Sequence, residues 1–308
     1  MLIACAANEA FLAPASAMLH SLTAAAGSTP VDVVVLHDEP LSTEGRARLE
    51  ESTGTACERL RFVPVEGALL EGLPTGHYSR TIWARTLLPE VLADAERVLY
   101  LDADTIVIES LVALWETQLG GAPLAAVANP LHPFMRDQPR LDLGIDDRRR
   151  YINSGVLLMD LELMREEGTV ARMREYARAH SANPYPDQDA FNALFSDRHV
   201  SLHPRWNAQT PIWDLAVARL PFSPDEVRDA RTRPAIVHFT GPFKPWHFLC
   251  RHPFRDRYFE HLAATPWPAP AVEGRTPVNR LRRLLPADWM YRSLRARDAL
   301  AAAASRRR

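Results

Sequence analysis

The sequence predicts an α/β fold in which helices flank a parallel or mixed sheet. Short apolar runs typical of buried strands alternate along the chain with longer segments of helical periodicity. The chain has 308 residues, 47% of them hydrophobic, and can therefore bury a full core. In such folds ligands bind at the carboxyl ends of the strands, so polar residues that follow an apolar run are candidates for a site.

Each element follows from a local pattern of apolar residues. The runs expected to form strands are 2–7, 33–36, 60–65, 98–101, 124–128, 156–159 and 236–239. The segments expected to form helices are 13–25, 43–52, 79–92, 161–180 and 187–195.

Composition narrows the classes of function. The formal net charge of −2 gives the whole molecule no electrostatic case for binding nucleic acid. The three cysteines are far apart and suggest neither a disulfide framework nor a thiolate zinc site. The first residues lack the pattern of a signal peptide, and no apolar stretch reaches membrane-spanning length. We expect a cytoplasmic protein.

The C-terminal part differs in composition from the rest. Prolines at 266, 268 and 270 suggest that a compact domain, 1–265, is followed by a linker and tail, 266–308. From residue 275 onward there are 10 arginines and two acidic residues, interleaved with leucines and aromatic residues. Such a basic amphipathic segment favours peripheral contact with an anionic membrane, and a packed helix with a basic face is the alternative. We expect the tail to lie outside the functional site.

The strongest motif is an apolar strand that ends in Asp102-Ala103-Asp104. Side chains two apart on extended backbone point the same way, so the two carboxylates are expected to converge on one hard divalent cation. The same residues resemble the nucleophile motif of haloacid-dehalogenase-type phosphatases. That reading fails, because those enzymes carry the motif near the N-terminus and need a later lysine followed by an acidic cluster.

Two further motifs carry polar residues suited to a sugar. Asn153 and Gly155 lead into the strand at 156–159; the asparagine can both donate to and accept from a hydroxyl. Asp187 and Gln188 begin a helix. Capping explains the aspartate but not the glutamine, whose amide could bind a sugar ring or stabilise a developing oxocarbenium ion.

A fourth motif joins a histidine to a lysine across a Gly-Pro turn. His238 ends the strand at 236–239, and Gly241 precedes Lys244, the only lysine in the chain. A neutral imidazole nitrogen makes His238 a candidate third metal ligand. Every other Lys or Arg position in this chain is arginine, so we expect the one lysine to have a chemical role that arginine does not fill.

These four motifs, in this order, resemble glycosyltransferase family 8 over about residues 1–260. The resemblance implies a GT-A fold, a Rossmann-like nucleotide-diphospho-sugar transferase, with Mn²⁺ or Mg²⁺ and retention of anomeric configuration. It implies a UDP-sugar donor carrying glucose or galactose, and a glycan or glycolipid acceptor of the cell envelope.

The resemblance also assigns roles to residues. Asp102, Asp104 and His238 would bind the metal, and Lys244 and Gly241 the diphosphate. The donor shell would be completed by Ala6, Asn8, Phe11, Arg85, Ala103, Asn153, Asp187 and Gln188. Gln188 would lie beside the anomeric carbon; with Asp187 and Lys244 it forms the expected catalytic set. The family commonly has a tyrosine to stack on the base, so Phe11 keeps the ring but lacks the hydroxyl.

Two other functions remain as alternatives. A sugar-nucleotide pyrophosphorylase would need a loop rich in glycine and basic residues after the first strand, where this chain has Ala6-Ala7-Asn8-Glu9. A non-catalytic sugar-nucleotide-binding scaffold would be marked by a broken metal site, whereas all three expected ligands are present.

Overall fold

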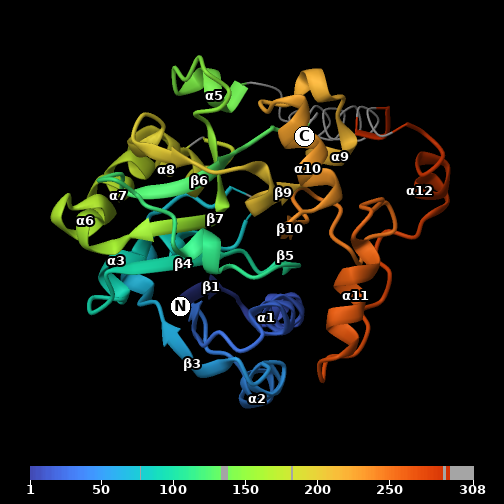
Figure 1. The fold of residues 1–308 in the computed structure, drawn as a ribbon, viewed down its shortest axis with the longest axis horizontal. Coiled ribbons are helices and arrows are strands. Elements are labelled where there is room, and N and C mark those ends of the chain that lie inside the picture. Colours follow the sequence, from blue (N-terminus) through green and yellow to red (C-terminus); the bar gives the residue numbers. More distant parts are fainter. Residues whose placement is uncertain (77, 133–137, 182, 287–288, 292–308) are drawn as a thin grey trace, which may run out of the picture.

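A computed structural model describes residues 1–76, 78–132, 138–181, 183–286 and 289–291. A seven-stranded mixed sheet, in the order β3-β2-β1-β4-β7-β6-β8, forms its centre, and a three-stranded sheet has the order β5-β10-β9 (Figure 1). The strands are β1 Leu2–Ala6, β2 Val31–His37, β3 Cys57–Pro64, β4 Arg97–Leu101, β5 Thr105–Val107, β6 Leu124–Ala128, β7 Ile152–Asp160, β8 His199–Ser201, β9 Ala208–Gln209 and β10 Ile236–His238.

Helices cover both faces of the large sheet. The α-helices are α1 Leu12–Ala26, α2 Thr43–Glu51, α3 Leu88–Val91, α4 Val112–Trp115, α5 Gln138–Asp142, α6 Leu161–Glu166, α7 Thr169–Ala179, α8 Pro186–Phe195, α9 Pro211–Asp214, α10 Pro224–Thr232, α11 Arg255–Ala263 and α12 Pro277–Arg282. Short 3₁₀ helices are η1 Glu9–Phe11, η2 Gly67–Leu70, η3 Arg80–Leu87, η4 Pro204–Asn207 and η5 Val217–Arg219.

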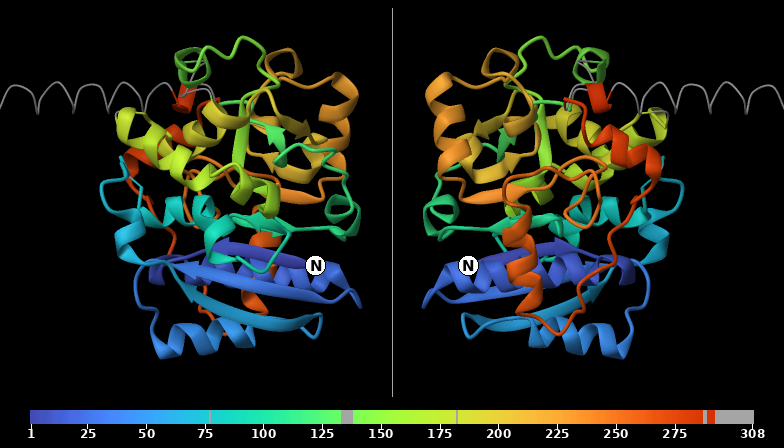
Figure 2. Two further views of the ribbon diagram at one scale, coloured as in Figure 1. Left: turned by 90° about the vertical axis from the view of Figure 1, so that its left-hand side faces the viewer. Right: turned by 90° about the vertical axis from the view of Figure 1, so that its right-hand side faces the viewer.

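The alternation of side chains along the strands produces two cores. Ile3 and Cys5 of β1 pack with α1 and α2 on one face of the sheet, whereas Ala4 packs with α3 and α8 on the other. In Figure 1, α3, α6, α7 and α8 lie on one side of the sheet and α1 and α2 on the other, and Figure 2 shows the molecule from each of these sides. Because strands β1, β2 and β4 are buried on both faces, they read in the sequence as nearly continuous apolar runs.

The site owes its position to one antiparallel pairing at the centre of the large sheet. β1 pairs in parallel with β2 and β4, and β7 runs antiparallel to β4, with Leu101 opposite Val156. The start of β7 therefore lies beside the end of β4. A backbone hydrogen bond of 2.8 Å from Asp102 N to the carbonyl of Gly155 continues the pairing beyond the strands. Two motifs about fifty residues apart in sequence thus meet where β4 ends and β7 begins.

Each expected strand is present, and the helices show two departures. The segment 79–92 is mainly the 3₁₀ helix η3, and α3 follows it only for one turn. The segment 161–180 forms two helices, α6 and α7, because Gly168 adopts a left-handed φ of 60° between them. Strands β5, β8 and β9, of two or three residues, were too short to leave a sequence pattern.

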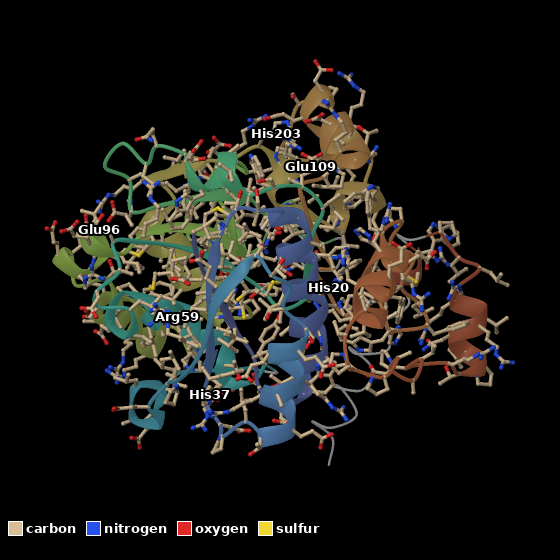
Figure 3. All side chains as sticks on the ribbon, turned by 60° about the horizontal axis from the view of Figure 1, so that its bottom comes forward. His20, His37, Arg59, Glu96, Glu109 and His203 are labelled. Atoms are coloured by element: carbon tan, nitrogen blue, oxygen red, sulfur yellow. The ribbon has the colours of Figure 1, made fainter. Side chains whose placement is uncertain are left out.

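One edge strand of the large sheet carries exposed charges, and α11 packs on α1 elsewhere on the outside of the fold. β3 forms an edge of the sheet and carries exposed charges, among them Arg59 (Figure 3), which discourage pairing with another chain. α11 packs on α1, where the Nδ1 atoms of His20 and His261 are 3.0 Å apart.

The C-terminal segment contributes α12 and a short stretch ending at Tyr291. Among the described residues, no helix is both long and apolar enough to cross a membrane. Residues 292–308, which belong to the expected basic tail, lie outside the described residues. The domain boundary at 265 stays a prediction.

Candidate active site

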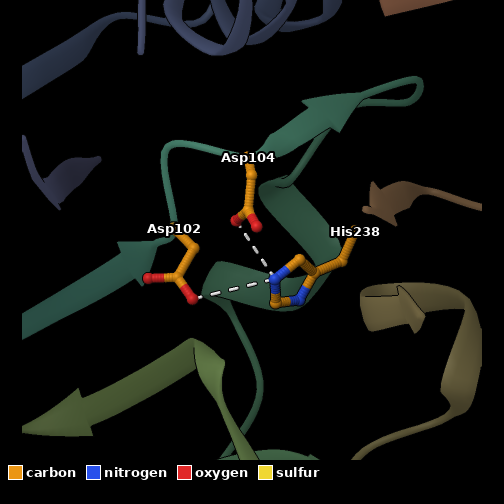
Figure 4. Close-up of side chains that lie close together, drawn as sticks. All are labelled: Asp102, Asp104 and His238. Carbon is orange, nitrogen blue, oxygen red and sulfur yellow. Dashed lines mark ion pairs between the residues drawn. The ribbon is translucent and has the colours of Figure 1, made fainter. Parts of the chain in front are cut away.

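Three side chains from the predicted motifs lie close together (Figure 4). Asp102, Asp104 and His238 each offer a ligand atom, and these atoms all lie within 4.8 Å of one another. His238 Nε2 is 3.2 Å from Asp104 Oδ1 and 3.7 Å from Asp102 Oδ2. The two aspartates follow β4 in a turn before β5, so a turn brings the carboxylates together. The expectation that extended backbone aligns them was wrong in its geometry.

Gly155 of β7 makes room for this cluster. A Cβ atom at position 155 would lie 2.2 Å from His238 Cε1 and 2.5 Å from Asp102 Oδ2. Any side chain there would displace both groups. Position 155 therefore requires glycine because the side chains of His238 and Asp102 come so close to it, and not because of an unusual φ.

A buried asparagine fixes the orientation of His238. Asn207, fully buried at the end of η4, places its side-chain oxygen 2.9 Å from His238 Nδ1. An amide oxygen only accepts hydrogen bonds, so Nδ1 carries a proton and donates it, and Nε2 is directed at the two carboxylates. Such a donor set, one imidazole nitrogen and two carboxylates held from behind, suits a divalent cation.

Lys244 lies against the same cluster. Its ammonium contacts a carboxylate oxygen of Asp104 and donates to the carbonyl of Phe239 at 2.8 Å. Burial alone would raise the pKa of Asp104, but the Lys244 ammonium opposes burial, and the pKa lies well below its usual range. Asp104 is thus ionised and available as an anionic ligand.

Arg85, on η3, links the cluster to the helix start of α8. Its guanidinium is 2.8 Å from Asp102 Oδ1 and 3.4 Å from Asp187 Oδ2, and it lies 4.8 Å from the ring centroid of Tyr100. Burial disfavours its charge, yet the carboxylates of Asp102 and Asp187 raise the pKa of Arg85 overall. The Tyr100 hydroxyl donates to Asp102 at 2.9 Å. Arg85 therefore remains a buried cation that holds two acidic residues in place.

Gln188 lies in a dense polar shell at the start of α8. Its side-chain oxygen accepts from the amides of Asn153 and Asn129, each at 3.2 Å. Its Nε2 donates to the Tyr151 hydroxyl at 2.9 Å, which donates in turn to Asp189 at 2.7 Å. This series of hydrogen bonds fixes the orientation of the Gln188 amide, with its oxygen toward Asn153.

The acidic residues around Gln188 are buried. Burial raises the pKa of Asp187, and the Arg85 guanidinium offsets part of that rise. Burial also raises the pKa of Asp189, to about 7, although the hydrogen bond from Tyr151 opposes it.

Asn207 donates to the Asn153 oxygen at 2.8 Å, so one asparagine connects the residues expected to bind the sugar to His238.

The expected nucleotide residues gather at the end of β1. Ala6 ends the strand, and Asn8 caps η1 by accepting from Phe11 N at 3.2 Å. The Phe11 ring is 38% exposed and meets Trp246 edge-on, with centroids 6.5 Å apart. Trp246 follows Lys244 closely, so this open ring and the lysine loop border one region. Ala103 lies buried between the two aspartates.

Gly241 lies in the loop that leads to Lys244. It has a φ of 85°, and a Cβ there would be 2.7 Å from Nε2 of His132. His132 follows Leu131, the one non-glycine residue with positive φ in the described chain, at 54°. A left-handed leucine beside the site marks backbone that packing holds in a strained form.

Sequence reasoning missed several residues that support the site. They are Tyr100, Asn129, His132, Asp189 and Asn207, together with the hydroxyl of Tyr151. Tyr100, Tyr151 and Asp189 each lie within two residues of a predicted site residue, so their position was a signal. Asn207 and His132 left none, because single polar residues in irregular segments look like loop residues.

The chain is similar to known proteins over most of its length. The family model described as glycosyl transferase family 8 matches residues 2–250. General stress protein A of Bacillus subtilis is 30% identical over 238 residues, covering 75% of this chain and 82% of that protein. Lipopolysaccharide 1,2-glucosyltransferase of Escherichia coli is 27% identical, covering 68% of this chain and 62% of its own length.

Solved structures share the fold. The galactosyltransferase LgtC, solved with donor and acceptor sugar analogues, superposes with a TM-score of 0.77 at 28% identity, covering 87% of this chain and 98% of that one. A second structure, an active-site mutant of LgtC with glutamine replaced by glutamate, has a TM-score of 0.75 at 27% identity and the same coverage.

Proposed function

The chain belongs to glycosyltransferase family 8 and has the GT-A fold, and on that premise we propose that it is a retaining, metal-dependent hexosyltransferase. It moves glucose or galactose from a UDP-sugar to a hydroxyl of a cell-envelope glycan or glycolipid. The relative named lipopolysaccharide 1,2-glucosyltransferase supports this acceptor class, and the donor and acceptor analogues bound to LgtC support a two-substrate transfer.

The observation that carries the proposal is the complete cluster of Asp102, Asp104 and His238 with Lys244 against it. A divalent ion held there, Mn²⁺ or Mg²⁺, supplies positive charge to the diphosphate leaving group. Lys244 adds a second positive charge within reach of the same oxygens. Electrostatic stabilisation of this kind is usually the largest contribution to catalysis.

The sugar would lie against the polar shell around Gln188. Asn153 and Asp187 supply hydrogen-bonding groups for its hydroxyls, and the Arg85 guanidinium, 3.4 Å from the Asp187 carboxylate, holds that side chain in place. The Gln188 oxygen already accepts from two amides, and an amide is a weak nucleophile. We therefore favour front-face attack, in which the acceptor hydroxyl forms the new glycosidic bond as the C1–phosphate bond breaks. A diphosphate oxygen takes the hydroxyl proton, and UDP leaves.

The nucleotide would occupy the open end of β1. Phe11 offers an exposed ring for stacking on uracil, while Ala6 and Asn8 offer backbone and amide groups. Gly241 lets the backbone of the lysine loop come close to the diphosphate, because its φ of 85° is open to few other residues.

We propose peripheral contact between segment 275–308 and an anionic membrane. Around α12 four large apolar side chains are exposed, by between 54% and 81% of their surface: Val278, Leu281, Leu284 and Trp289. Arginines stand among them at 275, 280, 282 and 283. This mixture of exposed leucine, tryptophan and arginine suits the headgroup region of a bilayer.

The two alternatives have less support. The family contains transferases, which speaks against a pyrophosphorylase, and the metal cluster is intact, which speaks against a silent scaffold.

The direct test is hydrolysis and transfer with a panel of nucleotide sugars in the presence of Mn²⁺. We expect UDP-glucose or UDP-galactose to be consumed in preference to GDP- or ADP-sugars. Proton NMR of the first product should show an α-anomer from an α-linked donor. Consumption of no UDP-sugar at all, or formation of the β-anomer, would contradict the proposal.

A further inference from the structure

The last described residues of the chain are buried, although sequence reasoning placed the tail outside the site. Met290 and Tyr291 are only 2% and 4% exposed. Trp289 beside them is 64% exposed, so the burial is selective. These two residues pack against the loop that carries Lys244, so this part of the tail borders the candidate site.

Tyr291 makes three contacts around that loop. Its ring stacks on Phe243, the residue before Lys244, with centroids 5.7 Å apart and planes 26° apart. Its edge meets the His132 ring at 5.1 Å. Its hydroxyl donates to Asp214 Oδ2 at 3.0 Å, which fixes the ring from the far end.

The loop is held tightly on both sides of Lys244. On one side the His132 ring fills the space beside Gly241, so Tyr291, His132 and Phe243 form one packed group. On the other side Met290 packs with Leu249, and the guanidinium of Arg251 donates to the carbonyl of Leu285 at 2.7 Å. Tyr291 therefore packs on the loop before the lysine, and Met290 and Leu285 contact the chain after it.

We infer that Tyr291 is a positioning residue for the transfer reaction: by holding Phe243 it sets where the Lys244 ammonium lies. The intervening backbone leaves little slack, because Lys244 is adjacent to Phe243 and its carbonyl accepts from His247 N at 2.8 Å in a tight turn. Without the Tyr291 ring, Phe243 loses its packing partner and the lysine loop can shift. The inference rests on the proposed role of Lys244 at the diphosphate.

The test compares Tyr291→Ala with Tyr291→Phe and Trp289→Ala in the full-length protein, without vesicles. We expect Tyr291→Ala to lower kcat of UDP-sugar hydrolysis about tenfold and to weaken UDP binding in calorimetry, with Mn²⁺ affinity unchanged. Tyr291→Phe retains the ring and should lose about threefold or less. Trp289→Ala removes an exposed neighbour and should behave as wild type.

A double-mutant cycle separates positioning from general loss of structure. In the Lys244→Ala background, Tyr291→Ala should change kcat less than twofold, because the group it positions is gone. An equal tenfold loss in both backgrounds, or no loss in the active wild-type background, would overturn the inference and leave the proposed function standing. A wild type that neither hydrolyses UDP-sugars nor binds UDP would overturn both. If Tyr291→Ala does not fold, Tyr291→Leu takes its place.

Discussion

Asn207 holds the imidazole of His238 from behind, with 2.9 Å between the asparagine oxygen and Nδ1. The same asparagine donates to Asn153 at 2.8 Å, so the expected metal ligand and the expected sugar contact share one buried support. Residues that orient a metal ligand typically change metal affinity ten- to a hundredfold when they are removed.

The first prediction concerns this support. Asn207→Ala should weaken Mn²⁺ binding by about ten- to a hundredfold, because His238 loses the partner that fixes its tautomer and ring plane. Asn207→Asp keeps an acceptor oxygen for Nδ1 and should lose much less. Calorimetric titration with Mn²⁺ measures both. Equal affinity in wild type and the alanine variant, both folded by circular dichroism, would show that His238 needs no such orientation.

The second prediction concerns the metal carboxylates. Asp104→Ala should abolish sugar transfer and donor hydrolysis while leaving the fold intact, because a divalent ion loses an anionic ligand and the diphosphate loses its clamp. Wild type in excess chelator should behave alike, and added Mn²⁺ should restore only the wild type. Undiminished transfer in either case would mean that the cluster is not a metal site.

The third prediction concerns the buried Asp189, whose pKa is raised to about 7. An unfolded aspartate titrates near about 3.9. The folded chain therefore holds an extra proton between these values, and the associated stability is fully present below about pH 4 and is lost as the pH rises through about 7. Asp189→Asn removes this titration.

Thermal unfolding of both proteins across this window measures the effect. The free energy of unfolding of wild type relative to Asp189→Asn should fall between about pH 4 and about pH 7, by at most about 1.4 kcal/mol for each pH unit, and level off at higher pH; the melting temperature should follow it. Parallel curves would mean that Asp189 is ionised throughout, held by Tyr151 alone.

The main strands could be predicted, and so could most residues of the candidate site, but not how the site is held together. Asp102 and His238 lie at or just after the end of an apolar strand and Gln188 lies at the start of a helix, so each was next to an element that the sequence indicated. Asn207 and His132 come from irregular segments whose path depends on contacts between residues far apart in sequence. Tyr291 was missed for a related reason. A basic amphipathic pattern describes the average of a segment, whereas two of its apolar residues are buried and their neighbours are exposed.

The fourth prediction concerns membrane contact. Arg280→Gln combined with Leu284→Ser should weaken binding to phosphatidylserine-containing vesicles by at least about fivefold, since each cation near the surface contributes on the order of 1 kcal/mol. Both residues are exposed on or beside α12, so donor hydrolysis should not change. Arg178→Gln, an exposed arginine on α7, is the matched control for net charge. Equal sedimentation of the double variant and wild type with vesicles would assign the exposed leucines another role.

The fifth prediction uses the single lysine. Lys244→Arg keeps the positive charge and would be harmless if position 244 were only a surface cation. The lysine is instead confined, since its ammonium contacts Asp104 and the Phe239 carbonyl. The loop that carries it is packed against other residues both before and after the lysine. A guanidinium is broader and cannot occupy the same space. A misplaced charge-assisted contact costs roughly 1.5–3 kcal/mol, so the rate should fall roughly ten- to a hundredfold.

The loss should appear equally in sugar transfer and in donor hydrolysis, because both reactions expel UDP. Lys244→Ala, which removes the charge altogether, should be at least as slow as Lys244→Arg. Mn²⁺ affinity provides the control, because Asp104 keeps its other partner, His238, in both variants. Steady-state kinetics of the two variants decide the matter: wild-type rates for both would mean that the lysine has no part in stabilising the leaving group, and that the bound cation and Arg85 carry that charge alone.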